Sequence, residues 1–231
     1  MLIDLHAHSA GISLCCRTDY KQILHTAQEY GIDGIVLTNH YQKCYVGEGG
    51  LAEFVEKYIA EYVAAYEYGK TIGCKVFFGI EVTTVFDPHL HLLIYGVDTD
   101  FLRKYPALFD YTPRQLRELV NANNGILIQA HPFRNGSTIL DLADIDGVEI
   151  NCHPLYQNAY SKELLDFVKG TDLIITCGGD YHADTYRPKC GMFLPDDVQD
   201  TFDVCAYLRS DKKKTLCIQE VNSSECWEAS V

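Results

Sequence analysis

Apolar, strand-like runs alternate with longer amphipathic segments along most of the chain. The runs are LIDL, GIVLT, KVFFGIEVTT, HLLIYGV, GILIQA, GVEINC and DLIITCGG. The spacing of apolar residues between them predicts helices at about 19–30, 51–71, 113–123 and 161–169, with a final helix and strand within 201–219. This alternation is typical of an α/β fold with a parallel sheet and helical crossovers. It leaves open a closed (β/α) barrel and an open doubly wound sheet, although no glycine-rich phosphate fingerprint follows the first strand.

Length and composition favour one domain that binds small molecules. The 231 residues contain no Pro/Gly/Ser linker and no fixed repeat, so we expect a single domain over 1–231, in which 200–231 forms a closing helix, strand and tail. A net charge of -13 disfavours nucleic acids and anionic membranes as partners. The ten cysteines show no CxxC spacing, and no export signal or membrane-length apolar run is present, so we expect reduced thiols and a cytoplasmic location.

The histidines are concentrated at the ends of the predicted strands. His6 and His8 stand two residues apart at the end of the first strand, where both side chains point to the same side. Apart from His25, the other histidines also follow or end strand-like runs: His40, His89, His91, His131, His153 and His182. Glu81 and Asp180 occupy similar positions. The carboxyl ends of barrel strands converge on one face. Because imidazoles and carboxylates are ligands of zinc, manganese and iron, the pattern predicts a polynuclear metal site.

Taken in order, the segments DLHAHS, GIVLTNH, FFGIEV with HLLIYG, ILIQAHPFR, VEINCH and GGDYHA resemble the motifs of the PHP (polymerase and histidinol phosphatase) family of metal-dependent phosphoesterases. The resemblance covers residues 2–182. It implies a distorted (β/α)7 TIM-like barrel with two or three divalent metal ions, zinc, manganese or iron, at the carboxyl ends of the strands.

The same resemblance implies a role for each matching residue. One metal would be held by His6, His8, Glu81 and Asp180, and Glu81 would bridge to a second metal held also by His91 and His131. His40 and His182 would belong to a third metal. The resemblance implies these catalytic groups: His6, His8, Glu81, His131, Asp180 and His182.

Two departures from the family pattern concern the third metal and its surroundings. Asn39 stands where the family commonly has aspartate. The loop GISLCCRTD after the first motif offers no histidine for the third metal, so Cys15, Cys16 or Asp19 are the candidate substitutes. A buried-thiol role is the competing interpretation of the cysteine pair.

The chemistry implied is hydrolysis of a small-molecule phosphate ester, a phosphomonoester or phosphodiester, by metal-activated water. Arg134, Arg17 and Arg187 lie beside the motifs and are candidates for binding the substrate phosphate. The alternatives are a protein-tyrosine phosphatase of the PHP type, an amidohydrolase-like hydrolase, and a non-catalytic metal-binding module. Glu81 and the late Asp-x-His disfavour the amidohydrolase.

Overall fold

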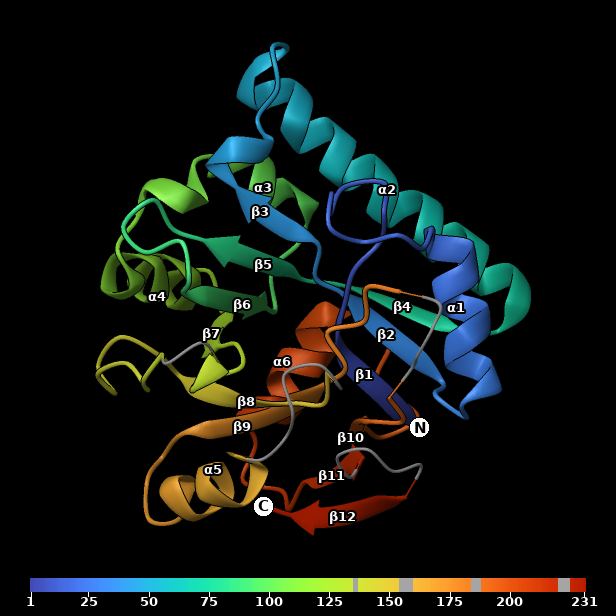
Figure 1. Ribbon diagram of the computed structural model, residues 1–231, viewed down its shortest axis with the longest axis vertical. Coiled ribbons are helices and arrows are strands. Elements are labelled where there is room, and N and C mark those ends of the chain that lie inside the picture. Colours follow the sequence, from blue (N-terminus) through green and yellow to red (C-terminus); the bar gives the residue numbers. More distant parts are fainter. Residues whose placement is uncertain (135–136, 154–159, 184–187, 220–224) are drawn as a thin grey trace.

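The computed structural model describes residues 1–134, 137–153, 160–183, 188–219 and 225–231, and it has a mixed α/β fold (Figure 1). The helices are α1 Tyr20–Glu29, α2 Gly50–Ile72, α3 Thr99–Lys104, α4 Pro113–Ala122, α5 Ser161–Val168 and α6 Thr201–Arg209, with 3-10 turns at η1 Lys43–Tyr45 and η2 Leu108–Asp110. The strands are β1 Leu2–Ala7, β2 Gly34–Leu37, β3 His40–Gln42, β4 Lys75–Phe78, β5 Ile80–Thr83, β6 His91–Tyr95, β7 Ile126–Gln129, β8 Gly147–Asn151, β9 Ile174–Gly178, β10 Gly191–Phe193, β11 Thr215–Gln219 and β12 Cys226–Ser230.

Among the predicted helices, α1, α4 and α6 have side chains that accept from their first backbone N–H groups, whereas α2 and α5 have no such cap. Asp19 caps α1 by accepting from the Gln22 N–H, and Thr112 with Gln115 makes a capping box ahead of Pro113 in α4. The short helix α3 was not predicted. Within the described residues, no helix is both long enough and apolar enough to cross a membrane.

The strands pair as two six-stranded sheets, in the orders β12-β11-β10-β1-β2-β4 and β3-β5-β6-β7-β8-β9. The chain passes from one sheet to the other at Thr38–Asn39, between β2 and β3, and at Gly79, between β4 and β5. A Cβ on Gly79 would lie 2.7 Å from side-chain atoms of both Thr38 and Val36, so only glycine fits this crossing. The α/β class is confirmed, but the hydrogen-bonded ladders do not close into the single barrel sheet that we expected.

The two sheets also meet at the ends of β1 and β9. Ala7 forms an isolated parallel bridge with Tyr181, and the Asp180 N–H donates to the His6 carbonyl at 2.8 Å. Figure 1 shows β1 entering the middle of the molecule beside β8 and β9. This contact brings the carboxyl end of β1 against the segment that follows β9.

The expectation of parallel strands was wrong for β6, which runs antiparallel to both β5 and β7. Only residues 84–90 connect β5 to β6, whereas a parallel crossover needs about a dozen residues or more. The reversal places the start of β6, and therefore His91, at the edge where β5 ends.

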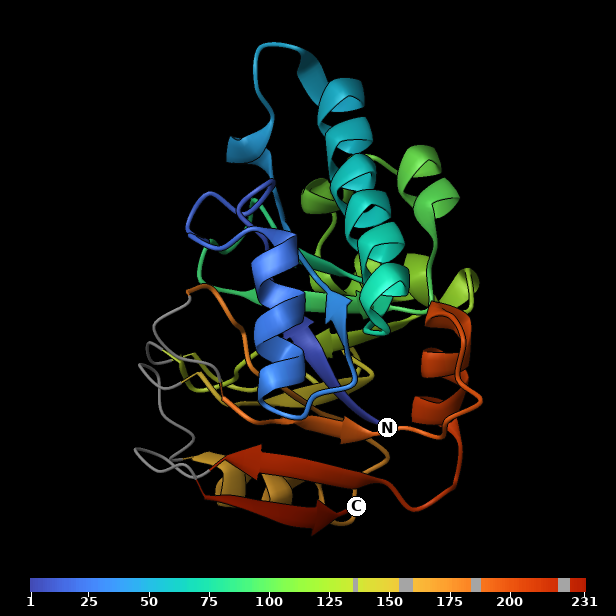
Figure 2. The same ribbon diagram turned by 90° about the vertical axis from the view of Figure 1, so that its right-hand side faces the viewer.

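The C-terminal segment also departs from expectation. Residues 226–230, predicted as part of a tail, form β12 and pair antiparallel with β11. Figure 2 shows this hairpin stacked beside α5, away from the long helix α2.

Candidate metal centre

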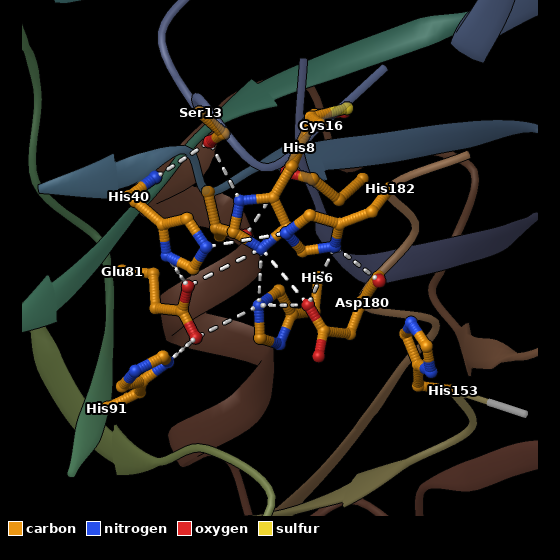
Figure 3. Close-up of polar contacts among 12 residues, drawn as sticks. His6, His8, Ser13, Cys16, His40, Glu81, His91, His153, Asp180 and His182 are labelled. Carbon is orange, nitrogen blue, oxygen red and sulfur yellow. Dashed lines mark hydrogen bonds and ion pairs between the residues drawn. The ribbon is translucent and has the colours of Figure 1, made fainter. Parts of the chain in front are cut away.

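Eight side chains predicted from the sequence as metal ligands lie around one buried point (Figure 3). His6 lies in β1 and His8 directly follows it, His40 and His91 open β3 and β6, Glu81 lies in β5, and His131, Asp180 and His182 follow β7 and β9. The reversal of β6 and the contact of β1 with the segment after β9 are what bring these strand ends together.

Glu81 lies at the centre of the cluster. Its carboxylate contacts five imidazoles: His91 Nδ1 at 2.9 Å, His6 Nε2 at 3.3 Å, His8 Nε2 at 3.4 Å, His131 Nε2 at 3.4 Å and, more closely still, His40 Nδ1. Oε1 contacts His6, His91 and His131, whereas Oε2 contacts His8 and His40. A carboxylate placed in this way can offer one oxygen to each of two cations.

His6 and His8 point their Nε2 atoms at the same place. These two atoms are only 2.9 Å apart, and Asp180 Oδ1 lies 3.5 Å from the first and 3.2 Å from the second. His6 lies in β1 and His8 comes just after its end, so the extended backbone there still places the two side chains on one side. Two aromatic nitrogens and a carboxylate oxygen directed at one point form a donor set suited to a divalent metal.

The hydrogen bond between His8 Nδ1 and Ser13 determines which ring nitrogen of His8 carries the proton and which carries the lone pair. Ser13 Oγ donates to Asn39 Oδ1 at 2.9 Å and accepts from the His40 backbone N–H, so its single proton is already used. The His8 Nδ1, 3.1 Å from Ser13 Oγ, must therefore carry the donating proton. This leaves a lone pair on Nε2, which faces Glu81 and Asp180.

Burial and charge act in opposite directions on the carboxylates. Burial alone would raise the pKa of Glu81, but the nearby imidazoles of His40, His91 and His6 hold it well below its usual range. Burial would likewise raise the pKa of Asp180, but Arg134 and His6 lower it. Both groups are therefore ionised at neutral pH.

The imidazoles divide into two kinds. Burial, together with the charges of His182 and His40, lowers the pKa of His8 well below its usual value, and burial lowers that of His131. For His6, burial also acts downward, but Glu149, Asp180 and Glu81 raise its pKa well above the usual value. The proton on His6 supplies positive charge to the carboxylates, a charge that a divalent cation could supply instead.

The donor set fits bound metal ions. Among the described residues, three overlapping groups each bring three ligand atoms within 4.8 Å of one another: His6, His8 and Glu81; His40, Glu81 and His91; His8, His40 and His182. Imidazole with carboxylate suits zinc, manganese and iron. The groups differ from the implied sets, because they include neither Asp180 nor His131 and because His40 adjoins both Glu81 and His182.

The backbone beside the ligands adopts left-handed conformations that only glycine adopts readily. His131, Phe133 and Asp180 have φ angles of 30°, 73° and 50°. For residues other than glycine, such conformations are uncommon and cost free energy. They are found most often at functional sites, where the surrounding structure enforces them. Their presence at two candidate ligands supports a functional role for this cluster.

No protein-family model matches the chain, and no curated protein matches it. Solved structures do match it. A protein from Bifidobacterium adolescentis assigned as a metal-dependent phosphoesterase is 16% identical, with 89% of this chain and 95% of that chain covered and a TM-score of 0.56. A two-domain protein from Bacteroides vulgatus that contains a predicted PHP-like metal-dependent phosphoesterase is 14% identical, with 95% and 65% covered and a TM-score of 0.67.

The chain has a PHP-like fold. The resemblance seen in the sequence motifs is thus confirmed at the level of the fold. An amidohydrolase from Chromobacterium violaceum, solved with bound sulfate and no metal, is also similar, at 14% identity, 91% and 99% coverage and a TM-score of 0.53. The PHP-like fold alone therefore does not distinguish the phosphoesterase from the amidohydrolase.

The three arginines predicted to bind phosphate differ in position. Arg134 reaches the cluster, where its Nη2 donates to Asp180 Oδ2 at 2.5 Å and to Asn151 Oδ1 at 3.1 Å. Arg17 is exposed in the loop after β1. Arg187 lies outside the described residues. Only Arg134 therefore has a described contact with a candidate ligand.

The substitutes suggested for the third metal are not equivalent. The Cys16 thiol donates to the carbonyls of His8 and Thr18, and burial raises its pKa to about 11, so it is a buried thiol rather than a thiolate ligand. Figure 3 shows its sulfur directed away from the cluster. Asp19 is occupied as the cap of α1. Cys15 lies close enough to the His182 side chain to raise the pKa of that imidazole.

Two histidines outside the implied ligand set lie apart from the centre. His89 is exposed in the loop before β6, where its N–H donates to Asp87. His153 is buried, and burial lowers its pKa to about 4, so its ring is neutral. Its ring centroid lies 6.3 Å from that of His182.

Sequence reasoning missed two buried carboxylates beside the cluster. Asp4 accepts from the backbone N–H groups of His6 and Gly179. Glu149 in β8 contacts His6 Nδ1 at 2.7 Å. The available signal was the position of each acidic residue in the middle of an otherwise apolar strand.

Replacing Ser13 with alanine should weaken metal binding about tenfold. The change removes the acceptor of the His8 Nδ1 proton, so the ring can place its proton on Nε2 and lose its metal-facing lone pair. Zinc titration of the metal-free protein against a competing chelator measures this. Ser210→Ala, at the end of α6, is the matched control, and equal affinities for the two variants would contradict the role assigned to Ser13.

Proposed function

We propose that this protein is a metal-dependent hydrolase that cleaves a small-molecule phosphate ester. The observation that carries the proposal is the convergence of Glu81, Asp180 and their surrounding imidazoles on one buried point of a PHP-like fold. We further propose that β1, β2–β3, β4–β5, β6, β7, β8 and β9 form the distorted (β/α)7 barrel that the sequence predicts. The Ala7–Tyr181 bridge between the ends of β1 and β9 supports this closure.

The side chains of the cluster are prepared for this chemistry before substrate arrives. Metal ions bound here would acidify a water molecule and offset negative charge on the phosphoryl oxygens. Neutral His8 and His131 present lone pairs, and ionised Glu81 and Asp180 present negative charge. The net charge of -13 favours a small substrate over a polyanionic polymer.

If no third metal is bound, His40 or His182 is the candidate proton donor to the leaving oxygen, and the contacts of His182 favour it. Burial alone would lower its pKa, but contacts with Cys15 and Asp180 raise it above the usual value. Its Nδ1 is held by the Asp180 carbonyl at 2.8 Å, which leaves Nε2 directed into the site beside His40. Arg134 is the candidate phosphate anchor, since its guanidinium already lies against Asp180.

An assay of metal content and turnover tests the proposal. Protein purified without chelator should retain at least two zinc, manganese or iron ions per chain and hydrolyse a generic aryl phosphate in a chelator-sensitive manner. Readdition of manganese or zinc should restore activity. Fewer than two bound metals together with no chelator-sensitive turnover would exclude the phosphoesterase.

Replacing His131 with alanine should remove one metal and most of the turnover while leaving the chain folded. The backbone N–H of residue 131, which donates to Glu149, is unchanged by this substitution, whereas the Nε2 contact with Glu81 is lost. His25→Ala is the control, because His25 lies on α1 and bonds Tyr68. Turnover retained in the first variant would show that the second metal site is assigned wrongly.

The similarity to an amidohydrolase makes that activity the second candidate. The same preparation should therefore be assayed with an amide, a lactone and a phosphotyrosine peptide beside the aryl phosphate. A preference for the amide or lactone would replace the phosphoesterase with an amidohydrolase. A preference for the phosphopeptide would indicate a protein-tyrosine phosphatase, and bound metal without turnover on any substrate would indicate a binding module.

A further inference from the structure

Glu149 occupies an unusual position for a charged residue. It stands in β8 between Val148 and Ile150, and its side chain has no solvent exposure. Taking a carboxylate out of water costs free energy unless hydrogen bonds compensate for it. A buried glutamate is therefore compatible with a stable fold only if hydrogen bonds satisfy both of its carboxylate oxygens.

Both oxygens are satisfied, and two of the three donors belong to candidate metal ligands. Oε1 lies 2.7 Å from His6 Nδ1. Oε2 accepts from the backbone N–H of His131 at 3.0 Å and from Asn151 Nδ2 at 3.1 Å. A carboxylate oxygen is an acceptor, so the His6 Nδ1 is the donor in this contact.

This contact determines how His6 can bind a metal. Because Glu149 accepts the Nδ1 proton, the ring directs its Nε2 toward the point that His8 also faces. The Nε2 atoms of His6 and His8 are 2.9 Å apart. A carboxylate that orients a metal-binding imidazole in this way also makes the ring a stronger ligand.

The same carboxylate joins ligands from the two sheets. His6 belongs to β1 in one sheet, and His131 follows β7 in the other. The approach depends on Gly178 in β9, because a Cβ at that position would lie 2.4 Å from His6 Cβ and 2.8 Å from Glu149 Oε1. Glu149 therefore sets the separation of two ligands that no shared strand holds in place.

We propose that Glu149 is a positioning residue of the metal centre, which fixes the ring orientation of His6 and the backbone at His131 so that both can bind metal. The inference rests on the proposed metal centre. It does not depend on which substrate is hydrolysed.

Glu149→Gln tests the proposal because an amide has one acceptor where the carboxylate has two. If the amide oxygen keeps the His131 and Asn151 donors, its NH2 group faces His6 Nδ1 and requires that nitrogen to accept. The His6 proton then moves to Nε2, which can no longer bind metal. We expect zinc and cobalt affinities to fall by 10- to 100-fold, with an altered visible absorption spectrum of the cobalt-loaded protein.

Glu163→Gln is the matched control, since it makes the same charge change on exposed α5, which packs against β8. Glu149→Asp keeps the charge but is one methylene too short to hold both His6 and His131, so it should also lose affinity. This variant decides the matter if the glutamine variant does not fold.

The outcomes separate this proposal from the proposed function. The positioning role is supported if both Glu149 variants bind metal more weakly than the parent while the melting temperatures of the metal-free proteins stay close to that of the parent. Parent-like metal affinity in either folded variant overturns it, as does a parent protein that binds no metal. A parent that binds metal but hydrolyses no phosphate ester overturns the proposed function alone.

Discussion

Replacing Glu81 with glutamine should abolish chelator-sensitive turnover and reduce bound metal. The glutamine side chain has nearly the same shape, but it is neutral, and one of its terminal atoms is an NH2 group that cannot bind a cation. Metal ions contribute several kcal/mol of transition-state stabilisation, so the loss of turnover should be about a thousandfold. Steady-state assays with the aryl phosphate and metal analysis of the same samples measure both effects.

The control for this variant is Glu56→Gln, which removes an exposed ion pair between α2 and Arg103. It should keep the metal content and turnover of the parent. A Glu81→Gln protein with parent-like metal content would show that Glu81 is a neighbour of the centre rather than a shared ligand.

Metal removal should lower the melting temperature by about 5 to 10 °C. A ligand at a hundred times its Kd stabilises the folded state by about 2.7 kcal/mol, and each kcal/mol shifts the melting temperature of a chain this size by about 2 to 4 °C. The physical reason is that the metal-free fold keeps ionised Glu81 and Asp180 buried, with only protonated imidazoles and Arg134 to balance their charge. Thermal melts in chelator, and after zinc or manganese is added back, measure the shift.

His131→Ala should show a smaller response to added metal than the parent, since it keeps only part of the donor set. Identical melting curves for the parent with chelator and with metal would contradict a structural contribution from bound cations.

Local signals in the sequence predicted the helices well. The spacing of apolar residues indicated α1 and α4 to within a residue or two. Short-range hydrogen bonds and side-chain spacing determine such elements. The direction of β6 was predicted wrongly because an apolar run looks the same in either direction, although the seven residues from 84 to 90 were too few for a helical crossover.

The ligands were easier to predict than the residues that hold them. His6 and His8 were recognisable because a strand places residues two apart on one face, and a set of such strand ends is rare. Glu149 was missed because a single acidic residue within a strand commonly marks a solvent-facing side. Only the tertiary structure shows that both faces of β8 are buried, and that this carboxylate meets His6 across the sheets.

The antiparallel pairing of β5 and β6 links a loop length to the chemistry of the centre. Thr83 pairs with His91, so residues 84–90 form the turn that sets this register. Because side chains alternate between the faces of a strand, a slip of one residue would turn His91 away from Glu81. Tolerance to insertions, normally a property of surface loops, should therefore be low in this hairpin even though Val85, Phe86 and His89 are exposed.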